Sequence, residues 1–267
     1  MAENQIDGRV IGISLDGVGY GSDGQIWGGE VLLADYRGFE RAAHLAYVPM
    51  PGGAAAIREP WRMAVGYLAA HYGAGLLHMN LPFVRRLDPR KVGILLRMIE
   101  RRVNCPLTSS CGRLFDAVAA LIGLRERVNY EAQAAIELEM VAADSTDSGA
   151  YPFELRREGG CWQIGTRPLF DAIIEDLARG VPNGAISRHF HNGLVAEFAH
   201  MAALMREETA LERVCLSGGV FQNVLVLEQL SRSLQQAGFE VFTHAEVPTG
   251  DGGLSLGQAV IAAHAVQ

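Results

Sequence analysis

The chain has 267 residues, of which 49% are hydrophobic and 31 are glycine, so it can bury a sizeable core in one large domain or two close-packed lobes. Its formal net charge of −7 argues against a nucleic-acid-binding surface, because phosphate backbones are held chiefly by clusters of Lys and Arg. No apolar run approaches the roughly 18 to 20 residues that cross a bilayer, and no signal pattern opens the chain, so we expect a cytoplasmic protein without a membrane partner.

The first half of the chain is expected to form strands and then helices. The β-branched run at residues 10–15 predicts a strand that stops at Asp16-Gly17 and opens into a glycine-rich loop. Apolar stretches at 31–33 and 39–48 predict two further strands of a meander. Apolar residues then recur at helical spacing in four segments, at residues 61–69, 94–99, 114–122 and 132–140.

The second half of the chain is expected to alternate between strands and helices. Segments 151–155 and 161–164 predict a hairpin. The elements predicted after it are, in order, helices at 169–177 and 183–207, a strand at 213–216, a helix at 220–237, a strand at 240–242 and a helix at 254–263. This pattern is typical of layered α/β folds that bind ligands at strand ends, and by itself it names no function.

Three glycine-rich segments, at residues 16–21, 217–223 and 250–253, adjoin predicted strand ends or helix starts. Glycine permits close backbone approach, and a helix amino terminus offers free N–H donors, so each segment could contact phosphate or could be only a turn. None has the spacing of a P-loop or a Rossmann fingerprint. Asp16 and Asp251 stand beside these glycines, where a hard cation next to phosphate could bind, although aspartate is also a common turn former or helix cap.

Cysteine and histidine patterns give no catalytic or metal motif. His189 and His191 form an H-x-H on a predicted helix, where residues two apart point to different sides, so we do not expect them to share a metal. No HExxH motif or nucleophile elbow supports zinc proteolysis or serine hydrolysis. The cysteines, which include no CxxC pair and are interpreted as reduced thiols, are Cys105, Cys111, Cys161 and Cys215.

Six segments of the sequence are informative through the order of their residues as well as through their chemistry. They are VIGISLDGVGYGSDGQIWGGE at 10–30, REPWRMA at 58–64, SSCGRLFDAVAALIGL at 109–124, YEAQAAIELE at 130–139, LSGGVFQN at 216–223 and GDGGLSLGQA at 250–259. In order and spacing they resemble the carboxy-terminal domain of the HypF hydrogenase-maturation carbamoyltransferases. That family is similar to the tRNA threonylcarbamoyl-adenosine synthases and the antibiotic O-carbamoyltransferases.

The resemblance implies an α/β fold of two lobes, actin-like or hexokinase-like, with its amino-terminal part truncated. Residues 1–105 would be the remainder of the first lobe and residues 106–267 the second, with a last helix that can pack back on the first. The implied ligands are ATP or carbamoyl-adenylate and a divalent metal, which is zinc or iron in the complete family site. The implied acceptor is the carboxy-terminal cysteine thiol of a partner maturation protein (HypE-like), whose thiocarboxamide becomes the cyanide ligand of nickel-iron hydrogenase.

Carried over residue by residue, the resemblance assigns metal and nucleotide roles and no protein nucleophile. Asp16 and Asp251 match the metal-ligand aspartates. The positions that match nucleotide contacts are Gly28 and Gly29 in a phosphate-facing loop, Gly112 and Asp116 at the ribose, and Ser217, Gly218, Gly219 and Asn223 in a second nucleotide loop. A cation beside the phosphate would favour attack on the carbamoyl carbon with AMP leaving.

The sequence departs from the family ahead of Val10, where the family carries two further metal ligands in an H-x-x-x-H and this chain reads MAENQIDGR. We therefore expect a fragment, one half of a split protein or a degenerate copy, with the histidine-bearing segment as a candidate separate partner. Two carboxylates do not complete a zinc or iron site, whereas magnesium can share its shell with phosphate and water. Two alternatives stay open: a small-molecule O-carbamoyltransferase, and a non-catalytic nucleotide-binding module.

Overall fold

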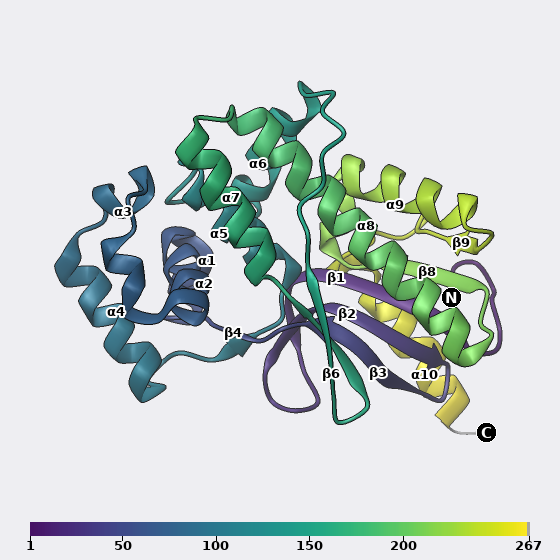
Figure 1. Ribbon diagram of the computed structural model, residues 1–267. Helices are drawn as coiled ribbons and strands as arrows, with labels where there is room; N and C mark the ends of the chain where they lie inside the picture. Colours follow the sequence, from purple (N-terminus) through teal and green to yellow (C-terminus); the bar gives the residue numbers. More distant parts are fainter. Residues whose placement is uncertain (266–267) are drawn as a thin grey trace.

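A single nine-stranded sheet runs through the computed structural model, which describes residues 1–265 (Figure 1). Three long strands, β1 (Val10–Tyr20), β2 (Ile26–Asp35) and β3 (Gly38–Leu45), form an antiparallel meander. The strands β8 (Arg213–Ser217) and β9 (Glu240–Phe242) extend it parallel to β1. The sheet order is β6-β7-β3-β2-β1-β8-β9, so β1 lies inside the sheet between partners from opposite ends of the chain.

The remaining strands are short and lie at the margins of the sheet. The hairpin β6 (Glu154–Glu158) and β7 (Cys161–Gly165) joins β3, while β4 (Val48–Pro49) and β5 (Leu107–Thr108) pair with each other. Strands from both sides of residue 105 therefore share one sheet. The expected division into lobes at 1–105 and 106–267 falls within this sheet and stays a prediction.

Helices cover both faces of the sheet and form a separate group at one end. Figure 1 shows α8 crossing in front of the strands and α10 behind them. The helices before β5 are α1 (Ala54–Arg58), α2 (Trp61–Tyr72), the 3₁₀ turn η1 (Gly73–His78), α3 (Pro82–Arg86) and α4 (Pro89–Arg101). Those after it are α5 (Cys111–Leu121), α6 (Gln133–Ala143), α7 (Arg167–Arg179), α8 (Asn183–Thr209), η2 (Gly219–Gln222), α9 (Val224–Gln236), η3 (Asp251–Gly253) and α10 (Leu254–Ala265). No helix of this described part is long and apolar enough to cross a membrane.

The helix α5 lies at the centre of the packing. All of its 11 residues are buried, because Gly112 and the run of alanines let β1, α2 and α6 approach its backbone closely. The long helix α8 covers the same core with a stripe of large side chains, among them Phe190, Leu194 and Phe198, each fully buried. Burial of each such side chain stabilises the fold by about 1.5 to 3 kcal/mol.

The α/β class expected from the sequence is confirmed, and most elements lie where their periodicity placed them. Several local boundaries differ from expectation, and two of these differences bear on the site. The strand β1 does not stop at Asp16-Gly17; it continues to Tyr20 through a bulge between Leu15 and Gly19. The helix expected over 220–237 is divided into η2 and α9, because the Asn223 side chain accepts the Val226 N–H and begins a new helix.

Candidate functional site

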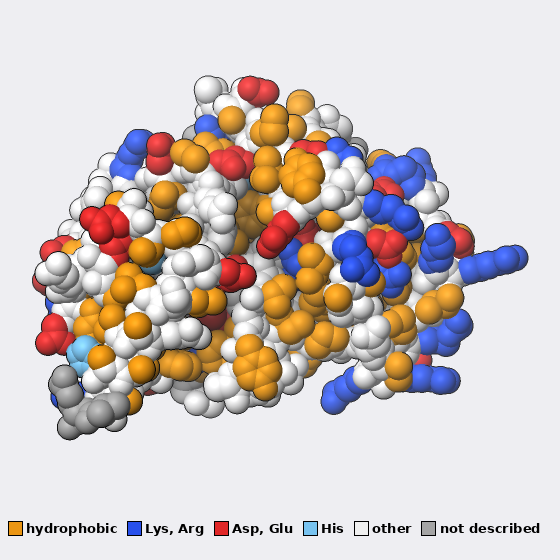
Figure 2. Space-filling view, turned by 180° about the vertical axis from the view of Figure 1, so that it is seen from behind, with side chains coloured by type: hydrophobic (Ala, Val, Ile, Leu, Met, Phe, Trp, Pro, Cys, Tyr) orange, Lys and Arg blue, Asp and Glu red, His pale blue; other side chains and the backbone are white. Residues whose placement is uncertain are grey.

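A cavity of about 650 Å³ opens where β1, α5, α6, η2 and η3 meet. Figure 2, which views the molecule from behind, shows a hollow near the middle of this face with acidic side chains at its edge. Predicted site residues from four separate segments line this cavity: Asp16, Gly112, Asp116, Gly219, Asn223 and Asp251. A second cavity, of about 390 Å³, lies beside Trp61, Arg86 and Glu126 and contains none of the predicted residues.

The floor of the larger cavity is built where α5 meets the bulge of β1. Ser110 is the N-cap of α5: its Oγ accepts the Arg113 N–H at 3.1 Å. The same hydroxyl lies within donating distance of the carbonyl oxygens of Asp16 (2.8 Å) and Gly17 (2.6 Å). A Cβ on Gly112 would lie only 2.8 Å from Gly17 Cα, so only glycine allows this approach. The helix amino terminus and the strand bulge are thus held together by backbone contact.

Asp16 is the carboxylate at this junction. Burial raises its pKa, and the charges of Asp251 and Glu131 raise it further, while hydrogen bonds from the Gly17 and Gly219 amides oppose the shift. The Gly17 N–H donates to Asp16 Oδ1 at 2.7 Å. Carboxylates that crowd one another in this way are stabilised when a cation or a proton lies between them.

The candidate metal ligands of the cavity are two carboxylates. Within residues 1–265 no group of three or more His, Cys, Asp or Glu side chains is arranged to hold a metal ion. Asp16 and Asp251 both line the cavity, and two carboxylates fit a hard cation that takes its other ligands from phosphate and water. They do not make the four-ligand site of a tightly held transition metal.

Asp116 lies deeper in the cavity, one helical turn after Arg113. Its side chain is 4% exposed, and burial raises the pKa of its carboxyl to about 6, against the opposing charge of Arg113. Arg113 Nε and Asp116 Oδ2 are 2.8 Å apart, yet the N–H does not point at the oxygen, and neither atom has a hydrogen-bond partner within the described chain. The pair is therefore a charge contact without a formed hydrogen bond.

Asn223 is held in a fixed orientation by the interior of the fold. Its Oδ1 accepts the Val226 N–H at 3.0 Å, and its Nδ2 donates to His191 Nε2 at 3.0 Å. His191 Nδ1 in turn donates to the Ser187 carbonyl oxygen at 2.7 Å, which assigns the neutral tautomer with its proton on Nδ1. Burial lowers the pKa of His191 to about 4, so the ring stays neutral and can accept.

Four predicted nucleotide contacts lie outside the cavity lining. The Gly28 and Gly29 amides donate to Glu30 Oε1 at 3.0 and 3.1 Å, so the expected phosphate-facing loop is occupied by a buried carboxylate. Gly218 packs on Leu15, where a Cβ would come within 2.1 Å of the carbonyl oxygen, and Ser217 Oγ lies 3.1 Å from His244 Nε2. These four residues therefore make contacts within the chain and do not line the cavity.

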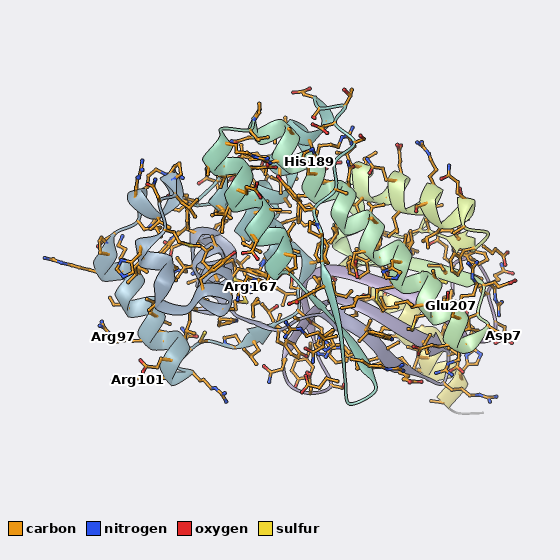
Figure 3. The ribbon with its side chains drawn as sticks, viewed as in Figure 1. Asp7, Arg97, Arg101, Arg167, His189 and Glu207 are labelled. Atoms are coloured by element: carbon orange, nitrogen blue, oxygen red, sulfur yellow. The ribbon has the colours of Figure 1, made fainter. Side chains whose placement is uncertain are left out.

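Sequence reasoning missed two residues that the structure brings to the site. Arg113 lines the cavity, and His191 holds Asn223. His191 and His189 have different partners, as expected: His189 Nε2 lies 2.9 Å from Asp147 Oδ1, whereas His191 accepts from Asn223. Figure 3 labels His189 on α8. The signal for Arg113 was its position within the segment 109–124, three residues before Asp116; no signal in the sequence linked His191 to Asn223.

Comparison with known proteins finds similarity to carbamoyltransferases. The family described as "Carbamoyltransferase, Kae1-like Domain, second subdomain" matches residues 12–258. Carbamoyltransferase HypF of Rhodobacter capsulatus is 42% identical over 258 residues, which are 96% of this chain and 32% of that protein. A carbamoyltransferase HypF homolog of Cupriavidus necator is 36% identical over 269 residues, 98% of this chain and 67% of that protein.

Solved structures agree with this similarity. Full-length HypF in the phosphate- and nucleotide-bound form matches with a TM-score of 0.94 and 42% identity, over 100% of this chain and 34% of that chain. HypF of T. kodakarensis matches with a TM-score of 0.86 and 35% identity, over 100% of this chain and 35% of that chain. The chain spans about a third of the length of both solved proteins and of the Rhodobacter capsulatus relative.

Proposed function

The chain belongs to the HypF carbamoyltransferase family, in the region of the second subdomain of its Kae1-like domain, and from that premise we propose that its cavity binds an adenine nucleotide for carbamoyl transfer. The observation that carries the proposal is the convergence of β1, α5, η2 and η3 on one cavity, each with a predicted site residue at its wall. A solved relative in a phosphate- and nucleotide-bound form supports the choice of ligand.

The nucleotide would be oriented by groups that the cavity already holds in place. Asp116 would accept hydrogen bonds from ribose hydroxyls, and Asn223 would offer its remaining amide hydrogen. Gly219 leaves the wall open for close approach of the ligand, since a Cβ there would meet Asp16 Oδ1 at 3.1 Å. Asp16 and Asp251 would hold a hard divalent cation such as magnesium, which supplies positive charge beside the phosphate.

The transfer itself would need no nucleophile from the protein. An acceptor thiolate attacks the carbamoyl carbon of carbamoyl-adenylate, a C–S bond forms, the C–O bond to the phosphate breaks, and AMP leaves with the electron pair. The acceptor thiol gives up its proton to solvent or a nearby base before the attack. We propose the carboxy-terminal cysteine of a HypE-like maturation protein as this acceptor, in the synthesis of the cyanide ligand of nickel-iron hydrogenase.

The decisive assay combines the chain with carbamoyl-adenylate and a peptide that ends in cysteine, and follows AMP release and the mass of the peptide. Carbamoylation of the thiol supports the proposal, and a peptide that ends in serine is the matched control. Transfer to the serine or to a sugar hydroxyl would instead indicate an O-carbamoyltransferase. Nucleotide binding without AMP release, also after addition of a separate histidine-bearing segment, would indicate a non-catalytic module.

A further inference from the structure

The lining of the larger cavity is strongly acidic, with a single exception. Five carboxylates line it within the described residues, and one basic side chain, Arg113, lies among them. The carboxylates are Asp16, Asp116, Glu131, Glu139 and Asp251. A nucleotide phosphate that enters this cavity is repelled by these carboxylates and attracted by Arg113, the one basic side chain among the described lining residues.

Arg113 is buried and its hydrogen-bonding capacity is largely unused. The residue is 6% exposed, and its Nε and Nη1 atoms, both shielded from solvent, have no hydrogen-bond partner within residues 1–265. Burial of a guanidinium donor without an acceptor costs free energy. In native structures such donors normally bind an acceptor from the protein, from water or from a ligand. Asp116 Oδ2 lies 2.8 Å from Arg113 Nε and neutralises part of the guanidinium charge, but it provides no acceptor for Nη1.

The surroundings of the guanidinium suit a phosphate group. Arg113 lies in the first turn of α5, where the amides of Cys111 and Gly112 have no acceptor within the helix. Gly17 faces it from the bulge of β1, since a Cβ built there would lie 3.9 Å from Arg113 Nη2. The amino terminus of the helix at Gly112, the backbone of Gly17 and the guanidinium of Arg113 are therefore neighbours in the cavity wall, and these kinds of donor suit phosphate oxygens.

We propose that Arg113 and the first turn of α5 form the subsite for the 5′-phosphate of the nucleotide, with Asp116 one turn further along the helix left to contact the ribose. This inference rests on the proposed function, because it assigns parts of the same ligand to parts of the same cavity. The competing role for Arg113 is purely internal, as the counter-ion of Asp116. The two roles differ in what they require of the ligand: only the first depends on a phosphate.

Calorimetric titration of AMP and of adenosine, both with magnesium present, separates the two roles. In Arg113→Gln we expect AMP affinity to fall about tenfold to one-hundredfold, the scale of lost hydrogen bonds to a charged group, while adenosine affinity changes less than about twofold. Arg113→Lys, which keeps the charge without the fork, should give an intermediate loss for AMP alone. Arg90→Gln, an exposed site on α4 with the same change of charge, should leave both affinities unchanged.

Equal losses for AMP and adenosine in Arg113→Gln would overturn the inference and make Arg113 a counter-ion of Asp116. Unchanged AMP affinity would overturn it as well. If Arg113→Gln does not fold, the ratio of AMP to adenosine affinity in Arg113→Lys decides by the same criterion. A wild-type chain that binds AMP no better than adenosine contradicts this subsite alone, whereas a chain that binds neither contradicts the proposed nucleotide site and this subsite with it.

Discussion

At the scale of single residues, the buried carboxyl of Asp116 makes the stability of the protein depend on pH. Burial raises its pKa from 3.8 to about 6, so the folded state binds this proton more tightly than the unfolded state. The protonated carboxyl therefore stabilises the fold below pH about 4, and that contribution is lost as the pH rises through about 6. From the size of the shift we expect a change of about 2 to 3 kcal/mol.

The measurement is urea unfolding of the wild type and of Asp116→Asn at pH 4.5 and pH 7.5. The asparagine variant cannot ionise at this position, so its stability relative to the wild type should improve by about 2 kcal/mol between the two pH values. A relative stability that does not change with pH would show that the carboxyl titrates normally. A change in the opposite direction would show that Arg113 holds Asp116 ionised in the folded protein.

His191 is expected to act on the nucleotide only through Asn223. His191→Phe keeps an aromatic ring against Phe115 and Phe190 but removes the acceptor at Nε2, so the Asn223 amide loses its orientation. We expect nucleotide affinity to fall about fivefold to tenfold, the scale of one hydrogen bond. In an Asn223→Ala background the same His191→Phe change should have no further effect on affinity. Additive losses in this double-mutant cycle would show that His191 contributes by packing alone.

Residue identity picked out Asp16, Asp116 and Asp251 in three separate segments, and all three line the larger cavity. It could not predict contacts made across the fold. The partners His191 and Asn223 are brought together by the packing of α8 against α9, which no local pattern encodes. Nor could it predict that the amides of Gly28 and Gly29, which are expected to face phosphate, donate to the side chain of Glu30.

At the scale of elements, the two glycines between β8 and η2 should respond differently to substitution. Gly218 has φ +110° and stands against the backbone of Leu15, so Gly218→Ala should destabilise the fold by about 2 kcal/mol or more. Gly219 has room for a Cβ apart from Asp16 Oδ1 at 3.1 Å, so Gly219→Ala should unfold like the wild type but bind nucleotide more weakly.

Thermal unfolding and nucleotide titration of the two variants test this difference. A Gly219→Ala protein with wild-type affinity would show that the ligand does not approach this loop. A Gly218→Ala protein of wild-type stability would contradict the close contact between β8 and β1. The larger change Gly219→Val should abolish nucleotide binding while the circular dichroism spectrum keeps its native form.

Element types followed from periodicity, but two boundaries depended on interactions between elements. The glycines after Leu15 read as a loop, whereas pairing with Trp27 and Ile26 of β2 keeps that segment in the sheet beyond the bulge. The apolar run after Gly219 read as one helix, and a single side-chain cap at Asn223 restarts it. The order of the sheet, with β8 beside β1, could not be read from local sequence at all.

At the scale of the whole molecule, stability is expected to be unevenly distributed. The helix α10 is apolar but contains no buried residue, and Ile261 is 55% exposed, although the ring of His264 lies 4.6 Å from that of Tyr36. By contrast, all of α5 is buried. Hydrogen exchange should therefore be fastest among the longer helices in α10 and slowest in α5 and β1.

A pair of substitutions gives the same comparison by another method. Ile261→Ser should change the free energy of unfolding by less than about 0.5 kcal/mol, whereas Leu230→Ala, at a fully buried position of α9, should cost about 2 to 5 kcal/mol. Protection of α10 equal to that of α5 would show that another surface covers α10 in solution.

Metal binding depends on the fold of the whole chain, because Asp16 and Asp251 come from opposite ends of the sequence and both line the cavity. Titration calorimetry should find weak magnesium binding to the chain alone and tighter binding when nucleotide is present, since phosphate completes the shell. Asp251→Asn should remove that gain. Stoichiometric zinc or iron after purification, unaffected by Asp251→Asn, would contradict the assignment of these two ligands.

The parallel pairing of β1 with β8 also constrains how the protein is made. Residues 11–14 pair with residues 214–217, which lie about 200 positions later in the chain. That edge of β1 therefore stays unpaired until the later residues have been synthesised. At a synthesis rate of about 5 to 20 residues per second, the delay is on the order of 10 to 40 s. Throughout that interval the nascent chain exposes an apolar strand edge to its neighbours on the polysome. Successful biosynthesis therefore depends on keeping this early segment from associating before its own partner strand has left the ribosome.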